Sequence, residues 1–126
     1  MFNPVALVID DDKNLSEAFA VALDIVGFET SVVNDSREAM ARIAAEQPAL
    51  VTLDMQMPNL TGADLLRQIR ANEQTRRVKI ILITANERAS ATDALVDMAD
   101  LILIKPVTLS QISEMAARLV PEISSS

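Results

Sequence analysis

The chain has 126 residues, a formal net charge of −7, and neither cysteine nor histidine. These features exclude disulfides and thiolate zinc sites, remove the commonest general base, and argue against direct binding of nucleic acid by this chain. Half of the residues are hydrophobic, and no apolar run is long enough to span a membrane. We therefore expect a single-domain cytoplasmic protein whose chemistry uses oxygen ligands together with lysine or arginine.

Three segments in the first half of the chain have the pattern of strands. Val5–Ile9 is an unbroken apolar run that ends in three acids. Glu29–Val33 is shorter and more polar, which is typical of a sheet edge. Residues 50–53 form a second apolar run, and Asp54 follows it directly. This pattern predicts buried strands that place carboxylates at their carboxyl ends.

Two helices are expected between these strands. Asn14 and Glu17 have the spacing of a capping box, and the apolar stripe that follows stops at Gly27. Ser36 is expected to cap a second helix that ends before Pro48.

The second half of the chain predicts two more strands. Residues 78–83 are apolar and lead to Thr84, while residues 101–104 lead to Lys105. Both strands therefore end in a polar side chain, as the first and third do.

Three further helices are expected in this half. Thr61 is the predicted cap of one, and Thr108 with Gln111 forms a predicted capping box for the last, which ends before Pro121. Between them, residues 91–98 suggest a short, weakly amphipathic helix whose first turn is not defined by the sequence.

Five strands alternating with five helices predict an α/β fold. We expect a three-layer, doubly wound, five-stranded parallel sheet of order 2-1-3-4-5, that is, a flavodoxin-like (βα)5 arrangement. This order changes direction between the first and third strands. The change brings Asp10, Asp11 and Asp54 together at one edge of the sheet.

Three neighbouring carboxylates require a positive charge, because two unit charges 4 Å apart repel by about 4 kcal/mol at an effective dielectric of ~20. Oxygen ligands suit Mg²⁺ (or Mn²⁺), and Lys105 would supply a second cation. Thr84 would add a hydroxyl. With Asp54 as the nucleophile, this set of groups predicts a phosphoryl-accepting pocket whose donor lies outside the chain.

Each of these residues also has an ordinary structural interpretation. The acids Asp10 to Asp12 could cap a helix, Asp54 could occupy a turn, Thr84 could be structural and Lys105 could be a solvated charge. Their joint placement at the carboxyl ends of neighbouring strands favours a common site.

The sequence resembles the receiver domains of two-component response regulators over essentially its whole length. The resemblance rests on an ordered set of segments: Val8-Ile9-Asp10-Asp11-Asp12, Leu53-Asp54-Met55-Gln56-Met57-Pro58 followed by Gly62, Thr84-Ala85, and Lys105-Pro106. It assigns residues 1–121 to a receiver domain and leaves 122–126 as a flexible tail or the start of a linker.

The resemblance implies that Asp54 takes a phosphoryl group from a sensor histidine kinase or phosphotransfer protein. Asp10, Asp11, Asp54 and the backbone carbonyl of Gln56 would hold Mg²⁺. Thr84 and Lys105 would contact the phosphoryl oxygens. The bond between Lys105 and Pro106 is expected to be cis. Such a domain catalyses only its own phosphorylation and dephosphorylation, and it signals to an output domain or partner that this sequence does not identify.

Three departures from the family pattern concern signal output. Ile102 stands where an aromatic switch residue is usual, Val107 replaces the common aromatic after Lys-Pro, and Met98 replaces a usual glycine. Ile102, Ile104 and Val107 could form an apolar docking surface, or they could be ordinary core residues. A homodimer through the fourth helix, fifth strand and fifth helix is also conceivable.

Two neutral amides are placed to influence the lifetime of an acyl phosphate. By the family pattern, Gln56 and Asn86 tune the access of water. Neither is a strong base, so we expect hydrolysis that is neither exceptionally fast nor blocked.

Other functions fit the sequence less well. A phosphohydrolase of the haloacid dehalogenase type would use Asp10 and Asp12 with Thr84 and Lys105, but Asn14 departs from that motif and no later acidic pair follows the lysine. An EF-hand fails because Leu15 stands where glycine is required. The stronger alternative is a receiver-like scaffold that binds partners without being phosphorylated.

Overall fold

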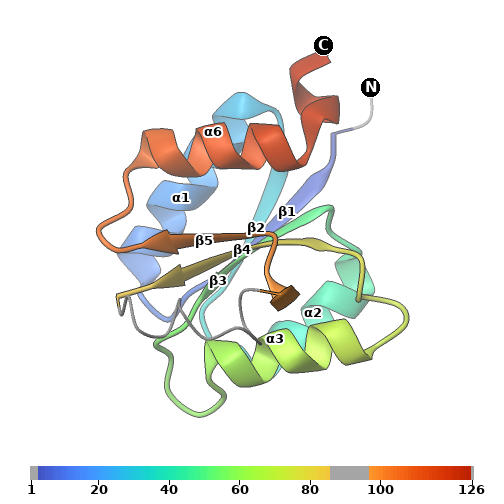
Figure 1. Cartoon of the computed structure of the whole chain (residues 1–126). Helices are drawn as coiled ribbons and strands as arrows, with labels where there is room; N and C mark the ends of the chain where they lie inside the picture. Colours follow the sequence, from blue (N-terminus) through green and yellow to red (C-terminus); the bar gives the residue numbers. More distant parts are fainter. Residues whose placement is uncertain (1–2, 86–96, 126) are drawn as a thin grey trace.

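The computed structural model describes residues 3–85 and 97–125, which form a parallel sheet between two layers of helices (Figure 1). The order β2-β1-β3-β4-β5 and the parallel pairing confirm the predicted topology. The strands are β1 (Val5–Ile9), β2 (Glu29–Val33), β3 (Leu50–Asp54), β4 (Lys79–Thr84) and β5 (Leu101–Ile104). The helices are α1 (Lys13–Val26), η1 (Ser36–Glu38), α2 (Ala39–Glu46), α3 (Gly62–Ala71), α6 (Leu109–Leu119) and η2 (Pro121–Ser125).

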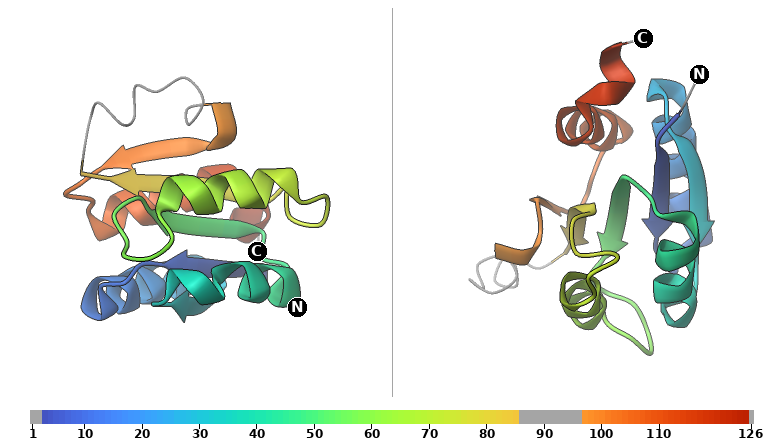
Figure 2. Two further views of the ribbon diagram at one scale, coloured as in Figure 1. Left: turned by 90° about the horizontal axis from the view of Figure 1, so that it is seen from below. Right: turned by 90° about the vertical axis from the view of Figure 1, so that its right-hand side faces the viewer.

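Helices cover both faces of the sheet (Figure 2). α1 and α6 lie on one face, and α2 and α3 lie on the other. Alternate residues of β1 enter the two cores: Leu7 belongs to the α2–α3 side and Val8 to the α1–α6 side. Burial on both faces explains why the inner strands are mostly apolar. Among the described residues, no helix combines the length and apolarity needed to cross a membrane.

Two of the predicted helix caps are wrong. α1 is capped by Asp12 rather than Asn14, since the Asp12 carboxylate accepts a hydrogen bond from the backbone N–H of Leu15 at 3.1 Å. Asp35 rather than Ser36 caps η1, which precedes α2. In both cases an acid one or two residues earlier takes the position. An anionic carboxylate there also interacts favourably with the positive end of the helix dipole.

The other predicted caps are confirmed. The Thr61 hydroxyl accepts from the N–H of Asp64 at the start of α3. Thr108 and Gln111 form the reciprocal capping box of α6, with contacts of 2.8 and 3.0 Å. Residues 91–96 of the helix expected at 91–98 lie outside the described residues.

The segment after α6 was expected to be a flexible tail or the start of a linker at 122–126. Residues 121–125 form η2, and Ile123 is only 7% exposed in the α1–α6 core. Gly27 ends α1 with φ of 119°, a conformation that favours glycine, and it lies against Ile123. Packing of the domain therefore continues beyond residue 121.

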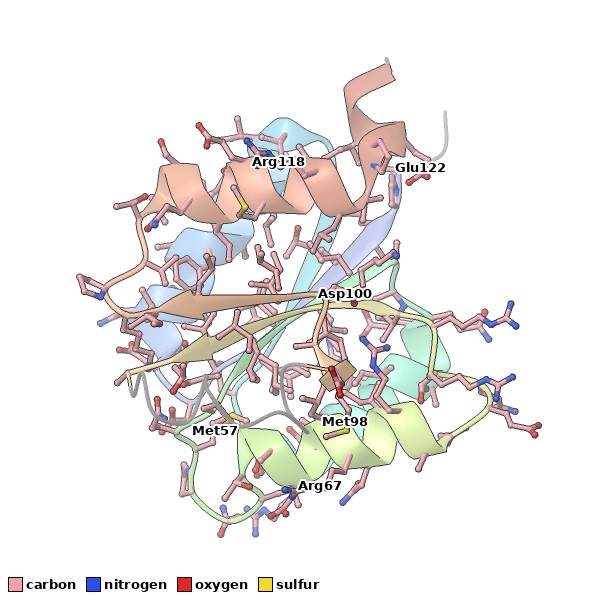
Figure 3. The ribbon with its side chains drawn as sticks, viewed as in Figure 1. Met57, Arg67, Met98, Asp100, Arg118 and Glu122 are labelled. Carbon is pink, nitrogen blue, oxygen red and sulfur yellow. The ribbon has the colours of Figure 1, made fainter. Side chains whose placement is uncertain are left out.

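Arg70 ties the end of α3 to the amino ends of β4 and β5. Its guanidinium donates at 2.7 Å to the carbonyls of Met98, Arg76 and Val78. It also pairs with Asp100 at 3.0 Å. Figure 3 labels Met98 and Asp100, which lie on the segment that leads into β5.

Candidate functional site

Three carboxylates converge at the carboxyl edge of the sheet. Asp10 follows β1 and Asp54 ends β3, and these two strands pair side by side at the point where the strand order changes direction. Both residues are 2% exposed, whereas Asp11 is exposed. One oxygen from each of the three lies within 4.8 Å of the others. The structure thus brings together the three acids that the sequence placed at this edge.

Lys105 reaches this acidic group from the end of β5. Its Nζ lies 3.1 Å from Asp54 Oδ1, and the same oxygen accepts from the backbone N–H of Gln56 at 3.0 Å. The backbone N–H of Lys105 donates to the carbonyl of Thr84 at 2.8 Å, which aligns the ends of β4 and β5. The bond between Lys105 and Pro106 is cis, as predicted.

The side chain of Gln56 spans the gap from the loop after β3 to the end of β4. Its Nε2 donates to Thr84 Oγ1 at 3.2 Å, and its Oε1 accepts from the backbone N–H of Ala85 at 3.1 Å. Thr84 is fully buried. The hydroxyl and the amide at the end of β4 are therefore both bonded to one neutral side chain.

The electrostatics of the site favour binding of a cation. Burial raises the pKa of Asp10 to about 6. A hydrogen bond from the backbone N–H of Asp12 opposes this rise, and the negative charge of Asp54 adds to it. Lys105 balances only one of the three carboxylates. Clustered oxygen ligands with excess negative charge fit Mg²⁺ or Mn²⁺.

Two residues of the loop after β2 support the acidic loops, and sequence reasoning missed this role. Asn34 Nδ2 donates to the carbonyl of Asp10 at 2.7 Å. Ser36 Oγ donates to the carbonyl of Pro58 at 3.1 Å and accepts from the N–H of Leu60 at 3.2 Å. Polar residues also follow this strand in the sequence, but only Ser36 was given a role there, as a helix cap.

Gly62 allows α3 to begin directly against the end of β3. A Cβ at this position would lie 2.5 Å from the carbonyl oxygen of Asp54 and 2.6 Å from Cα of Met55. Both contacts are with backbone, which cannot move aside as the end of a side chain can. Because Gly62 has no side chain, the start of α3 can pack directly on the backbone of Asp54 and Met55.

The residues expected to carry the output do not form one patch. Ile102 packs against the core cluster on the α2–α3 side, while Val107 packs on the α1–α6 side. Both are partly buried, and Ile104 is 39% exposed. These positions favour the core interpretation of Ile102 and Val107. Asn86 lies outside the described residues, and the possible homodimer stays a prediction.

Comparison with known proteins identifies the family. The family model of the response regulator receiver domain matches residues 6–117. The chain belongs to the response regulator receiver domain family. Response regulator MprA of Mycolicibacterium vanbaalenii is 35% identical over 107 residues, which cover 84% of this chain and 46% of MprA.

A second curated relative agrees with this assignment, and a solved structure shares the fold. The phosphate regulon transcriptional regulatory protein PhoB of Rhizobium meliloti is 30% identical over 127 residues, covering 97% of this chain and 56% of PhoB. The receiver domain therefore spans about half the length of these relatives. The signal receiver domain of a putative LuxO repressor from Vibrio parahaemolyticus superimposes with a TM-score of 0.86 at 22% identity, covering 98% of this chain and 94% of that one.

Proposed function

We propose that this receiver domain takes a phosphoryl group onto Asp54 from the phosphohistidine of a sensor histidine kinase or phosphotransfer protein. It then relays the signal to an output domain or partner through a conformational change. The observation that carries this proposal is the buried Asp54 carboxylate, 3.1 Å from Lys105 and within 4.8 Å of two more acids. A carboxylate so placed is a nucleophile with a cation beside the position of the incoming charge.

In the proposed reaction an oxygen of Asp54 attacks phosphorus and the bond from phosphorus to the donor's imidazole nitrogen breaks. The electron pair leaves on the imidazole, which becomes neutral or takes a proton from solvent, and Asp54 becomes an acyl phosphate. Lys105 and Thr84 would bind the phosphoryl oxygens. Because Lys105 already contacts Asp54 Oδ1, it has to share its charge with the new group or move to it.

Asp10, Asp11, Asp54 and the carbonyl of Gln56 would hold Mg²⁺, which when bound neutralises charge on the phosphoryl group. The raised pKa of Asp10 supports a cation in this place, since burial beside Asp54 disfavours its ionised form without one. In this proposal, signal output involves Thr84, Ile102 and Val107. Gln56 and Asn86 set the rate at which water removes the group, and the domain turns over no other substrate.

The test is the intact mass of the protein after incubation with Mg²⁺ and acetyl phosphate. We expect wild type to gain one phosphoryl group and Asp54→Ala to gain none. Glu73→Ala removes an exposed acid far from the site and should label like wild type. Labelling of Asp54→Ala would refute Asp54 as the acceptor. No labelling of wild type would favour a receiver that only its kinase can phosphorylate, or the alternative, a scaffold that binds partners without phosphorylation.

A further inference from the structure

We propose that the side chain of Gln56 is a latch that occupies the phosphoryl-binding groups at the end of β4 before phosphorylation. The phosphoryl group must then displace it. This inference rests on the proposed function of Asp54. It assigns Gln56 a positioning role before the reaction, which is separate from any influence on the later loss of the group to water.

The contacts of the carboxamide carry the inference. Oε1 accepts from the Ala85 N–H at 3.1 Å, and Nε2 donates to Thr84 Oγ1 at 3.2 Å. The backbone N–H of the same residue donates to Asp54 Oδ1 at 3.0 Å. Gln56 thus links the Asp54 carboxylate to the Thr84 hydroxyl and the Ala85 N–H at the end of β4.

An oxygen of a phosphoryl group on Asp54 would compete with Gln56 Oε1 for the Ala85 N–H, whereas Thr84 Oγ1 is the acceptor in its bond with Gln56 Nε2. A backbone N–H has one hydrogen, so the Ala85 N–H cannot make a full hydrogen bond to Gln56 Oε1 and to a phosphoryl oxygen together. The side-chain oxygen Oε1 of Gln56 therefore takes the position that a phosphoryl oxygen would take at this N–H. When it is displaced, Thr84 and Ala85 are released from the loop after β3 and become bound to Asp54 through the new group.

A neutral amide suits this role better than a charged group. A carboxylate here would add a fourth negative charge beside Asp10, Asp11 and Asp54, and would repel the donor phosphate. An ammonium group would pair with Asp54 and compete with Lys105. Two neutral hydrogen bonds are weak enough to exchange, so the latch lowers the apparent affinity for the phosphoryl group without blocking it.

The test uses beryllium fluoride, which forms a phosphoryl-like adduct on carboxylates, at saturating Mg²⁺ and with bound fluoride followed by ¹⁹F NMR. We expect Gln56→Met, which keeps side-chain length but removes both hydrogen bonds, to lower the half-saturating concentration by about five-fold, the ratio for one ordinary hydrogen bond. Gln56→Ala should shift it in the same direction. Gln68→Ala, an exposed amide on α3, should match wild type.

A second readout separates the latch from a general loosening of the loop. In adduct-free protein, Gln56→Met should speed amide hydrogen exchange at Ala85, whose partner is lost, with no matching change at Lys105, whose N–H bonds to the Thr84 carbonyl. Equal or weaker adduct formation in Gln56→Met would overturn the latch. Failure of wild type itself to form the adduct, or adduct formation by Asp54→Ala, would instead overturn the proposed function.

Discussion

Two charged clusters lie at opposite ends of the sheet, and they differ in how well their charges are satisfied. At the amino ends of β4 and β5, Arg70 is paired with Asp100. At the carboxyl edge, Asp10, Asp11 and Asp54 share the neighbourhood of Lys105.

The Arg70 cluster is balanced. Within the described residues, its guanidinium donates hydrogen bonds to carbonyl and carboxylate oxygens. Asp100 also accepts from the N–H of Ile80 at 2.8 Å and lies 3.9 Å from Lys79. The carboxyl-edge cluster has three acids near one lysine, and burial raises the pKa of Asp10. Balanced charges hold a fold together, whereas unbalanced charges cost stability that a bound cation can restore.

The largest effect is expected from breaking the balanced cluster. Arg70→Met should lower the free energy of unfolding by about 3 kcal/mol, since it removes four hydrogen bonds and leaves partly buried carbonyls without a donor. Urea denaturation measures this. Arg67→Met, which loses only an exposed ion pair to Asp64, should cost less than about 0.5 kcal/mol. Similar losses in the two variants would show that the Arg70 contacts contribute little.

At the carboxyl edge, a substitution that removes a charge is expected to raise the free energy of unfolding instead of lowering it. The folded pKa of Asp10 lies above its ordinary value of 3.8, so the folded state binds more protons and stability falls as pH rises from about 4 to 6. Asp10→Asn removes this loss and should raise the free energy of unfolding of metal-free protein at pH 7 by up to about 3 kcal/mol.

Urea denaturation of both proteins in EDTA, at pH 4 and pH 7, measures this effect. The advantage of Asp10→Asn should become small at pH 4, where Asp10 is protonated in the folded state and about half protonated in the unfolded chain. Added Mg²⁺ should stabilise wild type more than the variant, because one ligand is gone. An advantage that is the same at both pH values would rule out ionisation of Asp10 as its cause.

The same Asp→Asn change in the Arg70 cluster should have the opposite effect on stability. Asp100→Asn should lower the free energy of unfolding by about 1 kcal/mol, because it weakens pairs with Arg70 and Lys79 that are partly solvent-exposed. An amide oxygen can still accept from the N–H of Ile80. Thermal and urea unfolding at pH 7 should place the two Asp→Asn variants on opposite sides of wild type. A stabilised Asp100→Asn protein would contradict the assignment of this cluster as balanced.

The smallest effect is expected from an uncharged buried group. Thr52 in β3 is 1% exposed, and its hydroxyl has no hydrogen-bond partner in the part of the chain that the structure describes. Thr52→Val keeps the shape of the side chain and should raise the free energy of unfolding by up to about 1 kcal/mol. Urea denaturation would detect it. A clear loss of stability would mean that the hydroxyl is satisfied.

The sheet and the acidic edge follow from local signals. An apolar run that ends in an acid identifies Asp54 without reference to any other part of the chain, and the same holds for Asp10. The number of crossovers and their handedness then restrict the strand order. Parallel strands must place their carboxyl ends at one edge, so Thr84 and Lys105 could be placed near these acids from order alone.

The caps and the chain end could not be predicted in the same way. Asp12 and Asn14 are both good caps by residue type. Which of them caps α1 depends on where the preceding strand ends. Ile123 looks like part of a polar tail in the sequence, and only the packing of α1 and α6 provides the core in which it is buried.

The sequence by itself determined the fold class, the strand order and the acids at the carboxyl edge, because each depends on periodicity and on residues adjacent along the chain. Tertiary structure alone decided how these groups are connected. Gln56 bonds to Thr84 28 positions away, and Arg70 bonds to Met98 across the same separation. Such contacts depend on the register of neighbouring strands and on side-chain reach to within an ångström, and no local pattern in the sequence encodes either.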